Sequence, residues 1–273
     1  MNEGNARKIL ARQPKKWIVN VVFVLALGVS LVWSFREASF NEQRFSTFGI
    51  SLRVMIQQFG QINWNFFFGT DPWAFTNGVV YLALQTLAVA FLGTLLGAIL
   101  ALPFGFLASR TIVGKAGAVV GNFLLTAIRV FPEVILAIMI VKGYGINSLS
   151  CLLAIGVHSV GMLGKLFAEI IDTMDKTPLE ALDAVGATGI QKIRFAILPN
   201  LLADFSSAAL YRLDINVRSA SVIGVVGAGG LGSVMLLAMY NWNWSTLGAI
   251  LLAVIVMVVA VDSISGYLRN KLV

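Results

Sequence analysis

The sequence has few charged residues and few of the side chains that usually carry catalysis. Only 12% of its 273 residues are charged, and it contains one cysteine and one histidine. A single cysteine excludes an intramolecular disulfide and any metal site built from several cysteines. Cys151 lies in an apolar run, which favours a small buried side chain. The G-x-x-x-x-G-K-[ST] loop that binds phosphate in ATP-hydrolysing proteins is missing, because neither Gly-Lys pair is followed by Ser or Thr.

Apolar residues, in contrast, make up 58% of the chain, and the mean hydropathy is +0.85. Soluble domains contain about 45–50%, so the composition indicates an integral membrane protein. The apolar runs show no period-two alternation, which argues against a β-barrel, and several approach the ~20 residues that a transmembrane helix needs. We therefore expect an all-α polytopic membrane protein with about six transmembrane helices, at residues 17–35, 78–101, 121–141, 148–168, 202–226 and 246–264.

The first apolar run has two interpretations. A cleaved signal peptide has an apolar core of ~7–15 residues and a small-residue cleavage site, whereas this run is nineteen residues long and ends in Trp33 and Phe35. We favour a retained span. Residues 1–77 would then hold a cytoplasmic N-terminus, this span and an external aromatic-rich segment containing Asp71-Pro72, and residues 78–273 would form the core.

The basic residues predict the orientation. With a cytoplasmic N-terminus, the internal segments hold twelve Lys or Arg, and the external segments hold four. Positive charge collects on the cytoplasmic side, so both termini and the polar segment 172–199 are expected to be cytoplasmic.

That polar segment carries a helix signature. Thr177-Pro178 precedes Glu180 and Asp183, and proline at a helix start with acids in the first turn is typical of an N-terminus. The helix should end near Gly186. By pattern alone, an ordinary amphipathic loop helix explains this segment equally well.

A glycine cluster follows the fifth apolar run. Gly227, Gly229, Gly230 and Gly232 fit G-x-G-x-x-G, but a dinucleotide site needs an acid about twenty residues later, and the next acid is Asp262. We favour a backbone break or tight helix packing in the membrane.

Charged residues inside spans are costly and are therefore candidates for function. Arg129 with Glu133, and Lys165 with Glu169, could form local pairs. Residues 212–218 either lie solvated at the cytoplasmic edge or face a cavity within the span, which we favour. His158 is either a pH-sensitive gate or ligand, or a hydrogen-bonded residue of the bundle. Cations exceed acids at comparable depth, which suits an anionic solute. The residues expected to line a translocation path are Arg212, Asp214, Asn216, Arg218, His158 and Arg129.

The polar segment resembles the cytoplasmic coupling motif of permease subunits of bacterial ABC importers, E-A-A-x-x-x-G followed by I-x-L-P. Glu180, Ala181 and Gly186 match, as do Leu198-Pro199, whereas Leu182 replaces the second alanine and Ala196 replaces the isoleucine; the anchor could instead be Ile193 or Ile197. The resemblance implies a coupling helix at about 178–190 that docks on an ATPase through Glu180, Ala181, Leu182, Ala184, Val185, Gly186 and Ala187.

Two further stretches, residues 158–171 and 216–232, resemble phosphonate-type ABC permeases. The likeness implies the type I ABC importer permease architecture and a solute such as phosphonate, phosphite or phosphate. It also implies a homodimer in the bacterial plasma membrane, an ABC ATPase dimer inside that binds the ATP, an extracytoplasmic solute-binding protein, and a gate at the glycine cluster. No cofactor, metal, nucleic acid or enzymatic activity is expected of the chain itself.

Three alternatives remain. The GAGGLG sequence is also similar to methionine-type permeases. An intramembrane enzyme using His158, for instance a protease, lacks a convincing nucleophile arrangement. A gradient-driven transporter would often show an internal repeat, and none is found.

Overall fold

The computed structural model describes residues 16–37, 42–69, 78–226 and 229–272, and the regular structure in these ranges is helical. The chain divides into two compact units, residues 1–57 and 58–273. The first unit contains α2 (Lys16–Glu37) and most of α3 (Glu42–Phe59). The expected aromatic segment around Asp71-Pro72 lies partly outside the described residues.

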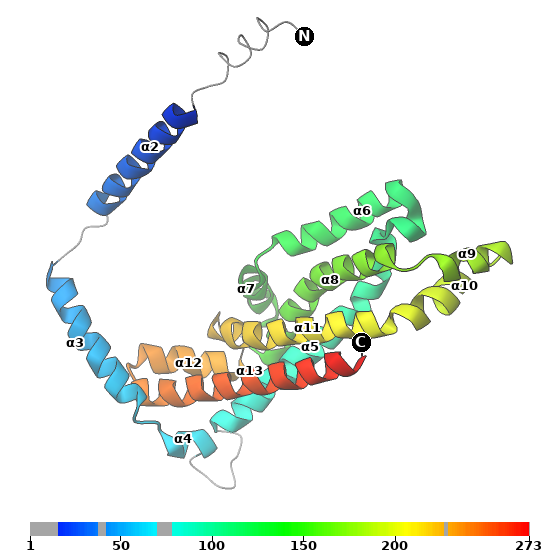
Figure 1. The fold of residues 1–273 in the computed structure, drawn as a ribbon. Helices are drawn as coiled ribbons and strands as arrows, with labels where there is room; N and C mark the ends of the chain where they lie inside the picture. Colours follow the sequence, from blue (N-terminus) through cyan, green and yellow to red (C-terminus); the bar gives the residue numbers. More distant parts are fainter. Residues whose placement is uncertain (1–15, 38–41, 70–77, 227–228, 273) are drawn as a thin grey trace, which may run out of the picture. The chain divides into compact units, whose positions relative to one another are not determined.

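Residues 58–273 form a bundle of long helices (Figure 1). Counting α2, six helical segments of the described chain are long and apolar enough to cross a membrane, which confirms the expected number. The helices that build the bundle are α4 (Trp64–Phe68), α5 (Val79–Ala108), α6 (Arg110–Val130), α7 (Glu133–Tyr144), α8 (Ser148–Thr173), α11 (Leu198–Ile223), α12 (Gly230–Tyr240) and α13 (Trp244–Leu272).

The contact between α5 and α8 rests on small residues. A Cβ built at Gly97 would lie 2.6 Å from the Cβ of Ser159, and one built at Gly105 would lie 2.8 Å from the Cβ of Phe167. Lipid chains are as apolar as leucine, so membrane helices associate by close packing rather than by exclusion of water. Glycine at these positions lets the two backbones approach.

Two predicted helix boundaries were wrong. The second span does not end at Pro103, since α5 continues to Ala108 with that proline inside it; long membrane helices tolerate such prolines when neighbours satisfy the freed carbonyl. The third predicted span, residues 121–141, is two helices. Phe131 is extended (ψ 122°), because the residue before a proline avoids the helical region.

The predicted break after the fifth span is confirmed. Helix α11 ends at Ile223, a short 3₁₀ turn follows at Gly224–Val226, and α12 begins at Gly230. Gly229 and Gly230 have positive φ angles of 84° and 68°, a conformation that glycine adopts without steric cost.

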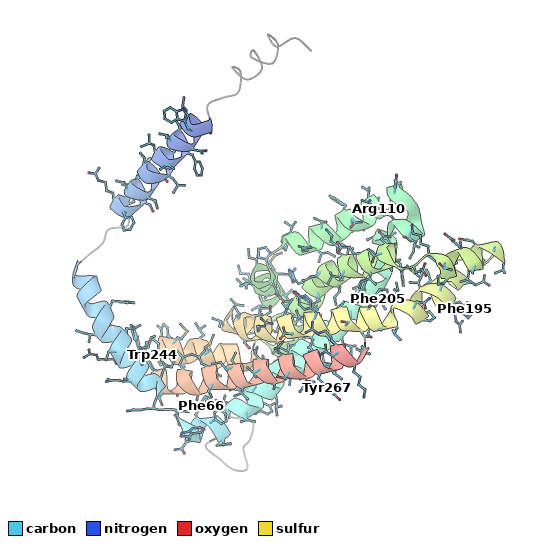
Figure 2. The ribbon with its side chains drawn as sticks, viewed as in Figure 1. Phe66, Arg110, Phe195, Phe205, Trp244 and Tyr267 are labelled. Carbon is cyan, nitrogen blue, oxygen red and sulfur yellow. The ribbon has the colours of Figure 1, made fainter. Side chains whose placement is uncertain are left out.

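An aromatic and aliphatic cluster fixes the ends of α8 and α11. The rings of Phe167 and Phe205 lie 4.7 Å apart, and Ile197 is fully buried beside them. Leu179 and Ile193, from the polar segment, pack against this cluster. Figure 2 shows Phe205 within the bundle and Phe195 on the end that projects from it.

Candidate translocation and docking sites

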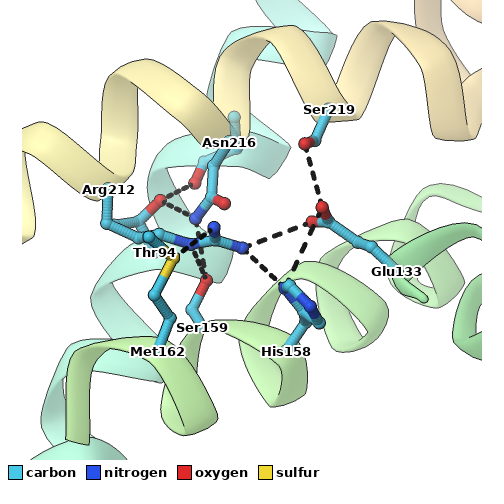
Figure 3. Close-up of polar contacts among 9 residues, drawn as sticks. Thr94, Glu133, His158, Ser159, Met162, Arg212, Asn216 and Ser219 are labelled. Atoms are coloured by element: carbon cyan, nitrogen blue, oxygen red, sulfur yellow. Dashed lines mark hydrogen bonds and ion pairs between the residues drawn. The ribbon is translucent and has the colours of Figure 1, made fainter. Parts of the chain in front are cut away.

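A buried polar cluster lies where α5, α7, α8 and α11 meet (Figure 3). The α11 side chains at positions 212, 216 and 219 are four and three residues apart, which places them on one face of the helix. Side chains of α8 at positions 158, 159 and 162 contact this face. We call these residues the central cluster: Thr94, Glu133, His158, Ser159, Met162, Arg212, Asn216 and Ser219.

Arg212 is the centre of this cluster and is only 2% exposed. Its Nε donates to the Ser159 hydroxyl at 3.1 Å, and its Nη1 donates to the Met162 sulfur at 3.1 Å. Its Nη2 lies 2.8 Å from Nδ1 of His158. A guanidinium only donates, so this contact requires an unprotonated Nδ1 on a neutral imidazole. The expectation that Arg212 lies within the span is supported, but the side chain is packed in protein rather than open to a cavity.

Glu133 supplies the counter-charge. Its Oε1 lies 3.6 Å from Nη2 of Arg212, and its Oε2 accepts a hydrogen bond from the Ser219 hydroxyl at 2.9 Å and lies 3.9 Å from Nδ1 of His158. The predicted pairing of Glu133 with Arg129 was therefore wrong. The break at Pro132 turns the start of α7 toward α11 and leaves Arg129 exposed on α6.

Asn216 ties three helices together and is fully buried. Its Nδ2 donates to the hydroxyls of Thr94 at 2.7 Å and Ser159 at 2.9 Å. Thr94 in turn donates to the carbonyl of Ala90 at 2.6 Å. No pattern in the sequence pointed to Thr94, Ser159 or Ser219, because a hydroxyl on an apolar helix gives no sign of its partner.

The expected excess of cations is smaller than the sequence suggested. Arg212 pairs with Glu133, and Arg218 pairs with Asp214 one helical turn away. The Arg218 side chain is 57% exposed, on a different face of α11 from Arg212. Within the described residues, neither Arg129 nor Lys165 forms an ion pair. The expected Lys165–Glu169 pair is therefore not formed. Lys165 and Glu169 instead line a pocket of about 530 Å³, together with Arg110 and Asp172.

The glycine segment packs closely against α5 and α11. A Cβ at Gly232 would lie 2.3 Å from the carbonyl oxygen of Ser221, and one at Gly230 would lie 2.5 Å from the Thr86 hydroxyl. That hydroxyl accepts a hydrogen bond from the backbone N–H of Leu231 at 3.0 Å. Gly229 lies instead against α8, where a Cβ would be 3.0 Å from the Ser148 hydroxyl. Gly227 lies outside the described residues.

The polar segment folds as a short helical hairpin that projects from the bundle (Figure 1). Helix α9 (Thr177–Ala184) has Pro178 in its first turn, as predicted, and ends at a turn in which Gly186 has a φ of 74°. After it come α10 (Gly189–Lys192), a π-helical turn at Ile193–Ile197 and then α11. An ion pair between Asp183 and Lys192 joins α9 to α10.

This hairpin exposes two large apolar side chains among polar residues. Val185 is 77% exposed and Ile190 is 79% exposed, beside the exposed Glu180, Ala181 and Ala184. Leu182 and Ala187 are half-buried. Ile190 was not among the predicted docking residues, although a large apolar side chain in a polar segment is a usable signal. The fold defines a multi-pass helical membrane protein.

Comparisons with known proteins agree with this class. Residues 93–273 match the family of binding-protein-dependent transport system inner membrane components, and the chain belongs to that family. It is similar to the phosphite transport system permease protein PtxC of Stutzerimonas stutzeri, with 39% identity over 188 residues, 68% of each chain. The phosphate-import permease protein PhnE of Mycolicibacterium smegmatis is 32% identical over 192 residues, 70% of this chain and 36% of the relative.

A solved structure shares the fold. The MetNI methionine ABC transporter, in an inward-facing conformation, contains a chain with a TM-score of 0.64 and 23% identity, covering 71% of this chain and 96% of that chain. The type I permease architecture expected from the resemblance is thereby confirmed, and the chain is a permease of an ABC importer.

Proposed function

We propose that this permease carries phosphite or a related phosphorus oxyanion, phosphonate or phosphate, across the membrane. The observation that carries this proposal is the similarity to the phosphite permease PtxC. The buried Arg212 guanidinium, a cation that forms strong charge-assisted hydrogen bonds with oxyanions, supports an anionic solute. The methionine alternative rests on more distant likenesses, to methionine permeases at 26% identity or less.

The proposed assembly contains two copies of this chain, an ABC ATPase dimer on the cytoplasmic side and an extracytoplasmic solute-binding protein. Both termini and the α9–α10 hairpin face the cytoplasm, as the distribution of Lys and Arg predicts. The ATPase dimer would bind ATP and dock on the patch around Val185 and Ile190, because exposed apolar patches with polar rims are typical of protein interfaces.

In the proposed mechanism, ATP binding draws the two hairpins together. Leu179 and Ile193 anchor each hairpin to the cluster that contains Phe167 and Phe205, so its movement is transmitted to α8 and α11. These helices carry the central cluster, and the glycine segment beyond α11 acts as the gate. The exposed face of α11, with Tyr211 and Arg218 seven residues apart, would line the path.

Docking is tested with charge changes in the hairpin. We expect Glu180→Lys and Gly186→Glu to abolish co-purification of the ATPase subunit and solute uptake while membrane insertion persists. Gly186→Glu also forces a side chain into a left-handed conformation that costs about 1–2 kcal/mol. Glu37→Lys, a charge reversal outside the hairpin, is the matched control. Undiminished ATPase recovery with both hairpin variants would disprove the docking role.

The solute is tested by uptake in cells that express the complete transporter. We expect uptake of labelled phosphite to be reduced by excess phosphonate or phosphate and to be unaffected by excess methionine. Competition by methionine alone would favour the other permease group, and uptake that persists without the ATPase would favour a gradient-driven transporter.

A further inference from the structure

The Glu133 carboxylate lies beside the buried Arg212 guanidinium, a group that also binds oxyanions. We propose that the Glu133 carboxylate holds the position of the transported oxyanion while the permease is empty, and that the oxyanion displaces it from Arg212. This inference rests on the proposed function, because it requires a phosphorus oxyanion as solute.

The donors converge on the carboxylate. Nη2 of Arg212 faces Oε1, and the Ser219 hydroxyl donates to Oε2, so groups from α11 approach both oxygens (Figure 3). Arginine binds carboxylates and phosphates through the same planar fork. A set of donors that accommodates Glu133 therefore also suits an oxyanion of similar charge.

The internal carboxylate uses these donors poorly. Its Oε1 is buried and accepts no hydrogen bond, and its distance of 3.6 Å to Nη2 exceeds that of a charge-assisted hydrogen bond. Nη1 of Arg212 donates only to the thioether of Met162, a weak acceptor. A phosphorus oxyanion with three oxygens and a charge of up to about −2 could engage Nη1 and Nη2 together, which the carboxylate does not.

Exchange keeps the buried cation neutralised. Removing Glu133 without replacement would leave Arg212 as an uncompensated charge, which is strongly unfavourable. The displaced carboxylate stays near the positive end of the α7 dipole, because Glu133 is the first residue of that helix. The exposed Arg129 lies only four residues earlier in the sequence.

Displacement would also change how the helices are joined. Within the described residues, Glu133 makes the polar contacts between α7 and α11, through Arg212 and Ser219. An oxyanion that takes over these donors releases the start of α7 from α11. Solute binding inside the membrane is thus linked to a helix movement.

The experiment measures phosphite binding to the permease assembled with its ATPase, at constant ionic strength, with sodium phosphite as the probe. We expect Glu133→Gln to bind phosphite about tenfold more tightly than the wild type, because the apparent affinity is reduced by the fraction of sites that the internal competitor occupies. Its melting temperature should be lower without phosphite and should rise more than that of the wild type when phosphite is added.

Glu169→Gln is the matched control, since it makes the same change on α8 outside the central cluster, and it should leave phosphite affinity unaltered. If Glu133→Gln does not fold, Glu133→Asp is used instead. It keeps the negative charge, but its shorter side chain places the carboxylate farther from Arg212, so it should also tighten phosphite binding. Equal or weaker binding in the variant that folds overturns the inference, provided the wild type transports phosphite. If neither phosphite, phosphonate nor phosphate stimulates ATP hydrolysis by the wild type assembled with its ATPase and solute-binding protein, the proposed function is overturned, and this inference with it.

Discussion

Arg212 illustrates how a charged side chain is accommodated inside a membrane helix bundle. An arginine at the centre of a span costs about 2.5–3.5 kcal/mol on insertion scales. Here it is 2% exposed, and hydroxyl, thioether, imidazole and carboxylate groups from α7 and α8 surround it. The central cluster offsets this cost, because it supplies hydrogen-bond acceptors and the counter-charge of Glu133.

The hydroxyl of Ser159 is shared by two donors, Nε of Arg212 and Nδ2 of Asn216. We expect the double-mutant cycle of Ser159→Ala and Asn216→Ala to give a coupling energy of about 0.6–1.7 kcal/mol, between the average and the maximum for interhelical hydrogen bonds in membranes. Reversible unfolding of the permease in mixed micelles measures it. Free energies that add to within ~0.3 kcal/mol would show that the contact contributes nothing.

At the scale of elements, three helix interruptions place the functional parts. The break at Pro132 aims Glu133 at α11, the positive φ of Gly186 ends α9, and the positive φ of Gly230 starts α12. Each interruption follows from backbone chemistry, because proline restricts the residue before it and glycine alone adopts left-handed conformations freely.

The close approach of α5 and α8 is tested at Gly97. A valine there would place its Cβ 2.6 Å from the Cβ of Ser159, so the helices must separate. We expect Gly97→Val to lower the free energy of unfolding by about 1–3 kcal/mol and to reduce uptake, since the central cluster depends on this packing.

The matched control for that substitution is Gly143→Val, because no atom lies within 4 Å of a Cβ built at Gly143. Equal stability of the two valine variants would contradict the packing argument. The comparison uses the same measurement of unfolding in mixed micelles.

At the scale of the whole molecule, the orientation decides which site meets which partner. The α9–α10 hairpin lies at the start of α11, and the loop after α12 lies at the opposite end of the bundle (Figure 1). The hairpin can therefore meet the ATPase only if the start of α11 is on the cytoplasmic side. Tyr240, which ends α12, is 83% exposed.

Cysteine labelling tests this orientation. In a Cys151→Ser background, we expect Ile190→Cys to react with a membrane-impermeant maleimide only after cells are opened, and Tyr240→Cys to react in intact cells. The unmodified chain should label weakly, because Cys151 is buried. The reverse pattern would invert the proposed topology.

Much of the fold could be predicted from the sequence because it depends on local properties. Apolar runs of sufficient length predicted the number of spans, Pro178 predicted the start of α9, and the glycine cluster predicted the break before α12. The two wrong boundaries both involve proline, whose effect depends on what surrounds it: Pro103 is accommodated within α5, whereas Pro132 separates α6 from α7.

The sequence by itself determined that this is a polytopic helical membrane protein with about six spans, since that follows from its composition and from the length of its apolar runs. Only the tertiary structure decided that Glu133 pairs with Arg212 rather than Arg129, and that Asn216, Thr94 and Ser159 form one network. The physical reason is that these partners lie on different helices. Their meeting depends on a backbone break and on the close approach of α5 and α8, which no local pattern specifies.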